Sequence, residues 1–349
     1  MTRAVFAIPG DKERRTGGFI YEATVLRVLN EIGCATDHLR LPDSFPDPTP
    51  EDMAETLALL RAVPKETPII LDGLVFGAID PEGLAEVDAP IMAMIHHPLG
   101  LETGLSPARA AFLKRNEAAA LRHARHMIVP SPETARLLAS EFGAERTRVT
   151  IALPGFERPV VQRQPLNPPL ILSVGLLAPR KGHDVLMDAL ALIEDLPWQA
   201  RIVGKDYQGE VTAALLAQRD RLGLGGRVAF TGEVGASTVE GLFNGASLFA
   251  LATRYEGYGM VLSEAMFYGL PIVTCSVGAV PDTVQDAALL VPPDDPAAFA
   301  DAMRRALTEP ILAQQLSTRA LRLAATLPTW EDTAQIFVDV IDAISRRVL

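Results

Sequence analysis

The segment TRYEGYGMVLSE, residues 253–264, contains the clearest structural signal in the sequence. A short apolar run precedes it, as expected of a buried strand, and a helical pattern follows it. Gly257 and Gly259 lack a Cβ, so they leave the backbone open to a ligand in front of that helix. Glu256 precedes the two glycines, and Glu264 lies on the helix. A strand, a glycine-containing turn and a helix in this order predict a doubly wound α/β domain with its ligand at the carboxyl ends of the strands.

Short β-branched runs alternate with amphipathic helical stretches along the rest of the chain. This alternation predicts an α/β protein with parallel sheets that helices cover on both faces. The expected strands of the first half are Ala4–Ile8, Pro68–Leu71, Ile91–Ile95 and His126–Val129. Those of the second half are Leu170–Val174, Arg201–Val203, Val228–Thr231, Leu248–Ala250 and Ile272–Thr274.

A proline-rich segment separates these two series of strands. Five prolines fall within residues 154–169, where they interrupt any helix or central strand. The length of 349 residues also fits two domains better than one core. We therefore expect a Rossmann-like N-terminal domain over residues 1–160 and a Rossmann-like C-terminal domain over residues 165–329. The helix expected over residues 330–349 would pack back on the first domain.

Composition excludes several classes of protein. With 32 Lys and Arg against 43 Asp and Glu, the net charge is −11, which argues against a general nucleic-acid binder. The only two cysteines, Cys34 and Cys275, form neither a disulfide framework nor a four-ligand zinc site, so we expect a cytoplasmic protein. The N-terminus does not resemble a signal peptide, and no apolar window is long enough for a spanning helix.

Two further loops have the composition of phosphate-binding loops between a strand and a helix. Residues 10–18 end on Gly17 and Gly18, where a phosphate could approach the backbone closely. Residues 175–183 contain Arg180 and Lys181, whose charges would add to a helix dipole. The alternatives are a plain flexible loop for the first and a solvated basic turn for the second. An acid such as Glu256 would repel phosphate, so its expected partner is a sugar or ribose hydroxyl.

Together, residues 174–182, 230–232, 253–264 and 269–273 resemble the retaining family-4 glycosyltransferases of GT-B fold, the glycosyl transferases group 1. The resemblance implies two Rossmann-like domains that face each other across a cleft. It implies an enzyme that moves a hexose, with retention, from a nucleotide-diphosphate sugar to an acceptor hydroxyl. By family prevalence the donor is a UDP-sugar. The acceptor is a small molecule, a saccharide or a lipid, and neither a metal nor a cofactor is implied.

The resemblance also assigns roles to individual residues. Lys181 would bind the diphosphate, and Arg180 would replace a cation that the family often has where this chain has Leu176. Glu256 would contact the donor sugar as a catalytic-centre residue, and Glu264 the ribose hydroxyls. The backbone of the remaining positions would hold the β-phosphate, the sugar or the base: Gly17, Gly18, Thr231, Gly232, Gly257, Gly259, Met260 and Val261.

His96 is the second catalytic-centre residue that the resemblance implies. It follows the strand Ile91–Ile95 and would form a hydrogen bond to the donor sugar, while its neighbour His97 would point elsewhere. The alternative is that either histidine only satisfies a backbone carbonyl at the strand end. No cluster of His, Cys or Asp accompanies this pair in the sequence, so a metal site is not expected.

Residues 107–127 carry an excess of basic side chains, with four arginines and one lysine against a single glutamate. Such a helix could lie on the anionic inner face of a membrane, as expected of an enzyme with a lipid acceptor. The alternative is an ordinary domain helix with a solvated cationic face, and Phe112 is its one aromatic anchor.

Two other classes of function stay open at this point. A nucleotide-sugar epimerase of GT-B fold would turn over its substrate without an acceptor. A non-catalytic protein would only bind the nucleotide-sugar. The sequence identifies neither the acceptor nor the oligomeric state.

Overall fold

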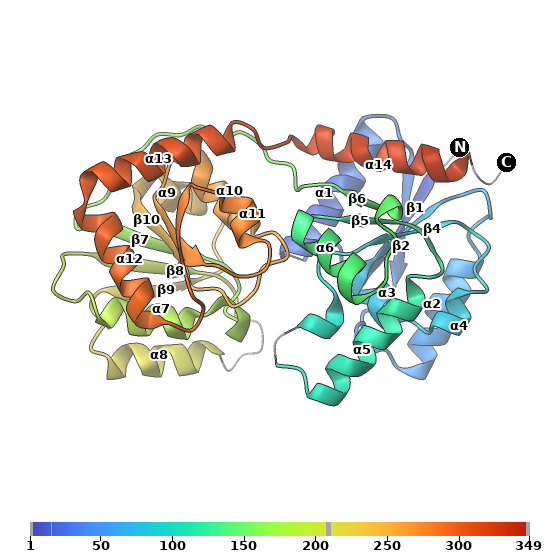
Figure 1. Ribbon diagram of the computed structural model, residues 1–349, viewed down its shortest axis with the longest axis horizontal. Helices are drawn as coiled ribbons and strands as arrows, with labels where there is room; N and C mark the ends of the chain where they lie inside the picture. Colours follow the sequence, from blue (N-terminus) through green and yellow to red (C-terminus); the bar gives the residue numbers. More distant parts are fainter. Residues whose placement is uncertain (1–2, 15, 103, 207–210, 347–349) are drawn as a thin grey trace. The chain divides into compact units, whose positions relative to one another are not determined.

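The computed structural model describes residues 3–14, 16–102, 104–206 and 211–346. The chain divides into two compact units (Figure 1). The N-terminal unit comprises Met1–Glu157 together with Pro328–Leu349, and the C-terminal unit comprises Arg158–Leu327. Each unit is a parallel sheet with helices on both faces, so each is described on its own below.

The sheet of the N-terminal unit has the strand order β2-β1-β3-β4-β5-β6, with all neighbours parallel. Its strands are β1 (Ala4–Pro9), β2 (Thr36–Leu41), β3 (Ile69–Asp72), β4 (Ile91–Met94), β5 (Ala124–Val129) and β6 (Val149–Ile151). Its helices are α1 (Gly17–Glu31), α2 (Pro50–Arg61), α3 (Gly73–Ala78), α4 (Pro81–Leu84), α5 (Pro107–Ala120), α6 (Pro132–Glu141) and α14 (Trp330–Ser345), with short 3₁₀ turns at Leu99–Leu101 and Arg146–Arg148.

The sheet of the C-terminal unit has the order β12-β11-β10-β7-β8-β9, again all parallel. Its strands are β7 (Leu170–Val174), β8 (Gln199–Val203), β9 (Val228–Gly232), β10 (Ala246–Leu251), β11 (Ile272–Cys275) and β12 (Ala288–Val291). Its helices are α7 (His183–Ala191), α8 (Val211–Arg221), α9 (Ala236–Gly245), α10 (Met260–Phe267), α11 (Val280–Val284), α12 (Pro296–Thr308) and α13 (Pro310–Ala324), with a 3₁₀ turn at Pro179–Lys181.

Both sheets contain a point where the order of the strands reverses. In the N-terminal unit the chain passes from β1 outward to β2 and then returns to β3 on the other side of β1. In the C-terminal unit it passes from β7 through β8 to β9 and returns to β10 on the other side of β7. The loops at such a switch point separate toward opposite faces, which leaves a crevice at the carboxyl ends of the strands.

Strands β2, β6 and β12 are the ones that the periodicity analysis missed. In β2 only the terminal residues Thr36 and Leu41 are fully buried, and β6 has no buried residue. In β12 only Val291 is fully buried. All three are edge strands, which lack the continuous apolar run of a central strand. The basic segment of residues 107–127 is not a single helix, because α5 ends at Ala120 and β5 begins at Ala124.

The C-terminal helix α14 belongs to the core of the N-terminal unit. It lies against α1 (Figure 1), where Tyr21 contacts the rings of Trp330 and Phe337. A capping box between Thr329 and Asp332 starts the helix. The chain crosses there so closely that a Cβ on Gly155 would lie 2.4 Å from the backbone nitrogen of Trp330.

We predict that Phe337→Ala lowers the free energy of unfolding of the N-terminal unit by about 3–5 kcal/mol, because Phe337 is fully buried against α1. Urea denaturation would measure the loss. Gln335→Ala, on the exposed face of the same helix, is the matched control and should change stability by less than about 0.5 kcal/mol. Equal effects of the two variants would contradict the docking of α14.

Candidate functional site

The switch point of the C-terminal unit brings two predicted loops together. The loop after β7 carries Arg180 and Lys181, and the loop after β10 carries Glu256, Gly257 and Gly259. The two loops are hydrogen-bonded to each other, because Arg254 N donates to Arg180 O at 2.8 Å. Arg180 Nη1 also donates to the carbonyl of Tyr255 at 2.9 Å.

Glu256 is the buried charge at the centre of this arrangement. Its side chain is 7% exposed, and Lys181 Nζ donates to its Oε1 at 2.6 Å. Thr253 Oγ1 donates to the same oxygen at 2.9 Å, and Arg180 Nη1 lies 3.7 Å from Oε2. Burial alone would raise the pKa of Glu256, but the charges of Lys181 and Arg180 and the hydrogen bonds outweigh it. The pKa of Glu256 is therefore lowered, and the carboxylate is ionised.

This pairing differs from the prediction in one respect. The sequence analysis predicts that Lys181 binds a diphosphate and that Glu256 contacts a sugar. In the structure, these two side chains form an ion pair with each other. Without a bound ligand, a buried carboxylate needs a cation beside it. The ion pair between Lys181 and Glu256 meets this requirement.

Glycines let the backbone of these loops come close to their neighbours. Gly182 has φ +63°, and a Cβ there would lie 1.9 Å from the carbonyl oxygen of Ala252. Gly278 has φ +48°, and a Cβ there would lie 2.4 Å from the carbonyl oxygen of Glu256. That carbonyl accepts a hydrogen bond from Ala279 N at 2.9 Å. Both glycines therefore fix the position of the loop that carries Glu256.

Helix α10 begins directly after this loop and presents its amino end at the same edge of the sheet. Gly259 precedes it with φ +88°, and no side chain caps the helix. The first amides, those of Met260 and Val261, are thus the donors that a helix start offers to an anion.

Glu264 lies one turn into α10 and is partly exposed. Burial raises its pKa to about 7. Among the residues that the structure describes, neither an ion pair nor a hydrogen bond is found for this carboxyl. The Glu264 carboxyl can therefore accept hydrogen bonds from a ligand, whereas the Glu256 carboxylate already accepts them from Lys181 and Thr253.

Thr231 and Gly232 lie elsewhere in the sheet. They end the edge strand β9, which β7 and β8 separate from β10. Thr231 Oγ1 donates to the carbonyl of Gly232 at 3.0 Å, and Gly232 O accepts from Gly204 N at 3.0 Å. The structure thus does not bring these two residues into the Lys181–Glu256 group.

In the N-terminal unit, the structure brings Gly18 and His96 together. Gly17 and Gly18 open α1, and His96 follows β4. A Cβ on Gly18 would lie 3.2 Å from Cδ2 of His96, so the glycine allows helix and ring to approach. Arg15, in the same predicted loop, lies outside the described residues.

Glu22 and Asp72 are residues of this edge that the sequence analysis missed. Glu22 Oε1 lies 3.1 Å from Nε2 of His96, and its side chain is 1% exposed. Asp72 is buried at the end of β3 and caps α3. Two signals were available in the sequence: Glu22 is one turn after Gly18 on the apolar face of its helix, and Asp72 directly follows an apolar strand.

Two searches of the described part of the chain found nothing. No group of three or more His, Cys, Asp or Glu side chains is arranged to hold a metal ion there. None of the described helices combines the length and the apolar character needed to cross a membrane.

Comparison with known proteins identifies the C-terminal unit. Residues 157–322 match the family described as Glycosyl transferases group 1. The C-terminal unit is a group 1 glycosyl transferase domain. Mannosylfructose-phosphate synthase of Agrobacterium fabrum is 27% identical over 62% of this chain and 52% of its own length. D-inositol 3-phosphate glycosyltransferase of Mycobacterium avium is 30% identical over 65% of this chain and 55% of its own. The matches thus span about half the length of these relatives.

Solved structures resemble the chain over nearly its whole length. Sucrose-phosphate synthase from Thermosynechococcus elongatus matches 98% of this chain and 99% of its own, with a TM-score of 0.83 and 21% identity. Anabaena HepE, solved in complex with UDP and glucose, matches with a TM-score of 0.77 and 17% identity over 98% of this chain and all of its own. The predicted α/β class with two Rossmann-like units, the GT-B fold, is confirmed.

We predict that Lys181→Met destabilises the C-terminal unit by about 3 kcal/mol at pH 8, because it leaves Glu256 buried without its main cation. Losing Lys181 also raises the pKa of Glu256, so the deficit should shrink as the pH falls and the carboxylate takes up a proton. Chemical denaturation at pH 8 and pH 5 would measure both effects. Lys205→Met, at an exposed position, is the control. A loss of stability in Lys181→Met that is the same at pH 8 and pH 5 would contradict an ion pair between Lys181 and Glu256.

Proposed function

We propose that this chain is a retaining glycosyltransferase that moves a hexose from a UDP-sugar to an acceptor hydroxyl. The observation that carries the proposal is the Lys181–Glu256 pair in front of the open amides of α10. It lies at the switch point of a domain that belongs to the group 1 glycosyl transferases. The UDP of the HepE complex agrees with such a donor.

The charges of the site suit departure of a nucleoside diphosphate. Breaking the sugar–phosphate bond leaves negative charge on the β-phosphate, which Lys181, Arg180 and the amides of Met260 and Val261 would stabilise. Lys181 would then turn from Glu256 toward the phosphate. Glu256 would exchange that cation for hydroxyls of the hexose, because a buried carboxylate needs donors.

Glu264 would accept hydrogen bonds from the ribose hydroxyls, since its carboxyl is open and one turn away on the same helix. Anomeric retention would follow from front-face substitution, in which the departing phosphate takes the proton of the acceptor hydroxyl. Such a step needs no nucleophile from the protein. His96 and the Gly18 end of α1 would act at the sugar and the β-phosphate from the N-terminal unit.

We predict that UDP-hexoses stabilise the wild-type chain against heat more than GDP- or ADP-hexoses do. A ligand at 100 times its Kd adds about 2.7 kcal/mol of apparent stability. Glu264→Gln should weaken binding of the UDP-sugar roughly tenfold by losing the ribose contact. Gln335→Ala, on the exposed face of α14 in the N-terminal unit, is the control.

The same preparation separates transfer from the other functions. UDP release that depends on an added acceptor supports transfer, whereas turnover of the nucleotide-sugar without an acceptor would indicate an epimerase. Stabilisation by the sugar with neither reaction, across a panel of acceptors, would indicate a binding protein. No stabilisation by any nucleotide-sugar would contradict the proposal.

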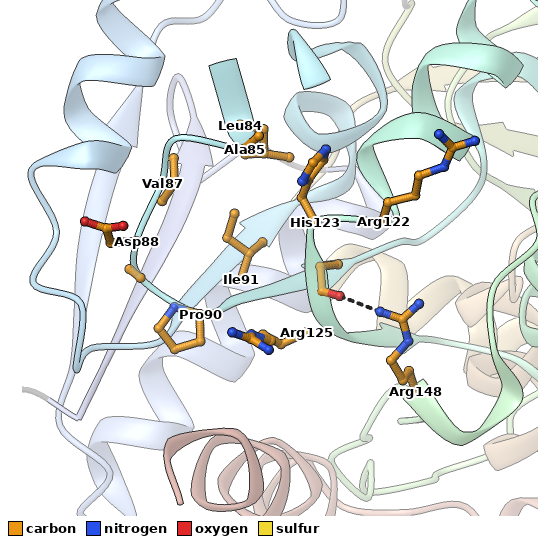
Figure 2. Close-up of a pocket in the computed structure, with 12 residues that line it drawn as sticks. Leu84, Ala85, Val87, Asp88, Pro90, Ile91, Arg122, His123, Arg125 and Arg148 are labelled. Carbon is orange, nitrogen blue, oxygen red and sulfur yellow. Dashed lines mark hydrogen bonds between the residues drawn. The ribbon is translucent and has the colours of Figure 1, made fainter. Parts of the chain in front are cut away.

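A second proposal concerns contact of residues 107–127 with an anionic lipid surface. Arg109 and Lys114 on α5 are paired with Asp47 and Glu141, at 2.6 and 3.0 Å. Arg122 and Arg125 lie instead beside a cavity of about 260 Å³ at the amino ends of β4 and β5. Figure 2 shows Arg122, Arg125 and Arg148 among the residues around this cavity, with Arg148 hydrogen-bonded to the carbonyl of Ala124.

We predict that the chain binds vesicles with anionic lipids at low salt but not at high salt, and that Arg122→Gln/Arg125→Gln abolishes this binding. Co-sedimentation would measure it. Arg136→Gln, which removes a paired arginine of α6, should leave binding unchanged. Equal sedimentation with neutral and anionic vesicles, or none with either, would contradict the lipid proposal and leave the transfer reaction untouched.

A further inference from the structure

Glu22 and Asp72 are two buried acids beside the half-buried His96 that the proposed reaction does not use; we call the three residues the acid–histidine cluster. Glu22 comes from α1, Asp72 from the end of β3 and His96 from the residues after β4. Glu22 and Asp72 are 1% and 3% exposed. No lysine or arginine is paired with either carboxyl in the described part of the chain. Two neighbouring carboxyls without a cation cannot both be ionised, so the cluster must hold a proton.

The surroundings decide where that proton lies. Asp72 Oδ1 accepts hydrogen bonds from the amides of Leu74 and Val75 at 2.8 and 3.3 Å, which favours an ionised Asp72. Among the described residues, no backbone amide donates a hydrogen bond to Glu22. Burial raises its pKa to about 8 against a lowering effect of its hydrogen bond with Asp72, while burial, the Glu22 charge and that hydrogen bond raise the pKa of Asp72. Because Asp72 already accepts hydrogen bonds from two amides, we place the shared proton on Glu22, directed toward Asp72.

His96 adds the third member of the chain of hydrogen bonds. Burial lowers its pKa to about 4, against an opposing effect of the Asp72 charge, so the ring is neutral at pH 7. The neighbouring Tyr21 ring stands edge-on at 5.2 Å, and its hydroxyl donates to the carbonyl of Ala152. Tyr21 thus offers no proton to His96. With the Glu22 proton directed to Asp72, Glu22 Oε1 is an acceptor for Nε2–H of His96 at 3.1 Å.

We propose that Glu22 is a positioning residue: as a neutral acid between Asp72 and His96, it holds the imidazole as the Nε2–H tautomer. The Nδ1 atom then carries a free lone pair at the carboxyl edge of the N-terminal sheet, where it can accept a hydrogen bond but not donate one. The group that Nδ1 accepts from would be a hydroxyl of the sugar substrate, and this last point rests on the proposed function.

The tautomer can be read without any substrate. Long-range ¹H–¹⁵N spectra of the full chain labelled with ¹⁵N-histidine distinguish protonated from unprotonated ring nitrogens, and His96→Gln assigns the signals. We expect protonated Nε2 and unprotonated Nδ1 from pH 5.5 to 7.5. His183, which is buried with a pKa of about 4 in the C-terminal unit, is the internal reference.

Two variants test the role of Glu22. Glu22→Gln should keep both the tautomer and the low pKa, because its amide donates to Asp72 as the acid does and its carbonyl accepts from His96. Glu22→Leu should give a mixture of tautomers. The proposal is overturned if wild-type His96 is the Nδ1–H tautomer, or if Glu22→Gln shifts the pKa of His96 by one unit or more, as expected of an ionised Glu22. The wild-type and Glu22→Gln spectra suffice if the leucine variant does not fold.

Kinetic measurements distinguish positioning of His96 from a purely structural role of Glu22. With a nucleotide-sugar that turns over, Glu22→Gln should retain kcat within about threefold, and Glu22→Leu should lose at least tenfold in kcat with little change in KM for the acceptor. A parallel loss in both variants would contradict positioning. If no nucleotide-sugar turns over, the proposed function fails, while the spectra still decide the tautomer.

Discussion

Glu256 is a buried carboxylate, and such a charge persists only where cations and hydrogen-bond donors surround it. The loops at the carboxyl edge of the C-terminal sheet meet that requirement. Lys181 and Arg180 come from the loop after β7, and Thr253 from the loop after β10. Gly182 and Gly278 allow the close backbone contacts that hold these loops in place. An anionic ligand that binds Lys181 removes this cation from Glu256, so the same ligand must also donate hydrogen bonds to Glu256. Binding of the anion is therefore coupled to binding of neighbouring hydroxyl groups.

Buried glutamates in the two units have pKa values shifted in opposite directions. In the C-terminal unit two cations keep Glu256 ionised, so the group can exchange a cation for a ligand. In the N-terminal unit no cation is paired with Glu22 among the described residues; burial raises the pKa of Glu22 to about 8 and lowers that of His96 to about 4. The first edge thus presents charge where a diphosphate would leave, and the second presents a neutral hydrogen-bonding group. Both edges lie at switch points of their sheets, where the topology opens a crevice.

The sequence predicted the fold class and the central strands, because parallel strands covered on both faces read as apolar runs. It missed β2, β6 and β12, whose exposure at sheet edges removes that signal. The glycine spacing predicted the loop of residues 253–264 and its position before a helix. Its pairing with Lys181 depends on a contact over 75 residues, which no local pattern contains. Glu22 and Asp72 went unnoticed because single acids in apolar segments are identified as a cluster only once the sheet brings them together.

A crystal structure of the full chain with UDP would show whether a ligand displaces Lys181 from Glu256. We expect Lys181 Nζ to contact the diphosphate and no longer to lie 2.6 Å from Glu256, with Glu264 within hydrogen-bonding distance of the ribose hydroxyls. A nucleotide bound away from α10, or one bound there with the Lys181–Glu256 pair intact and Glu264 without a contact, would contradict this expectation.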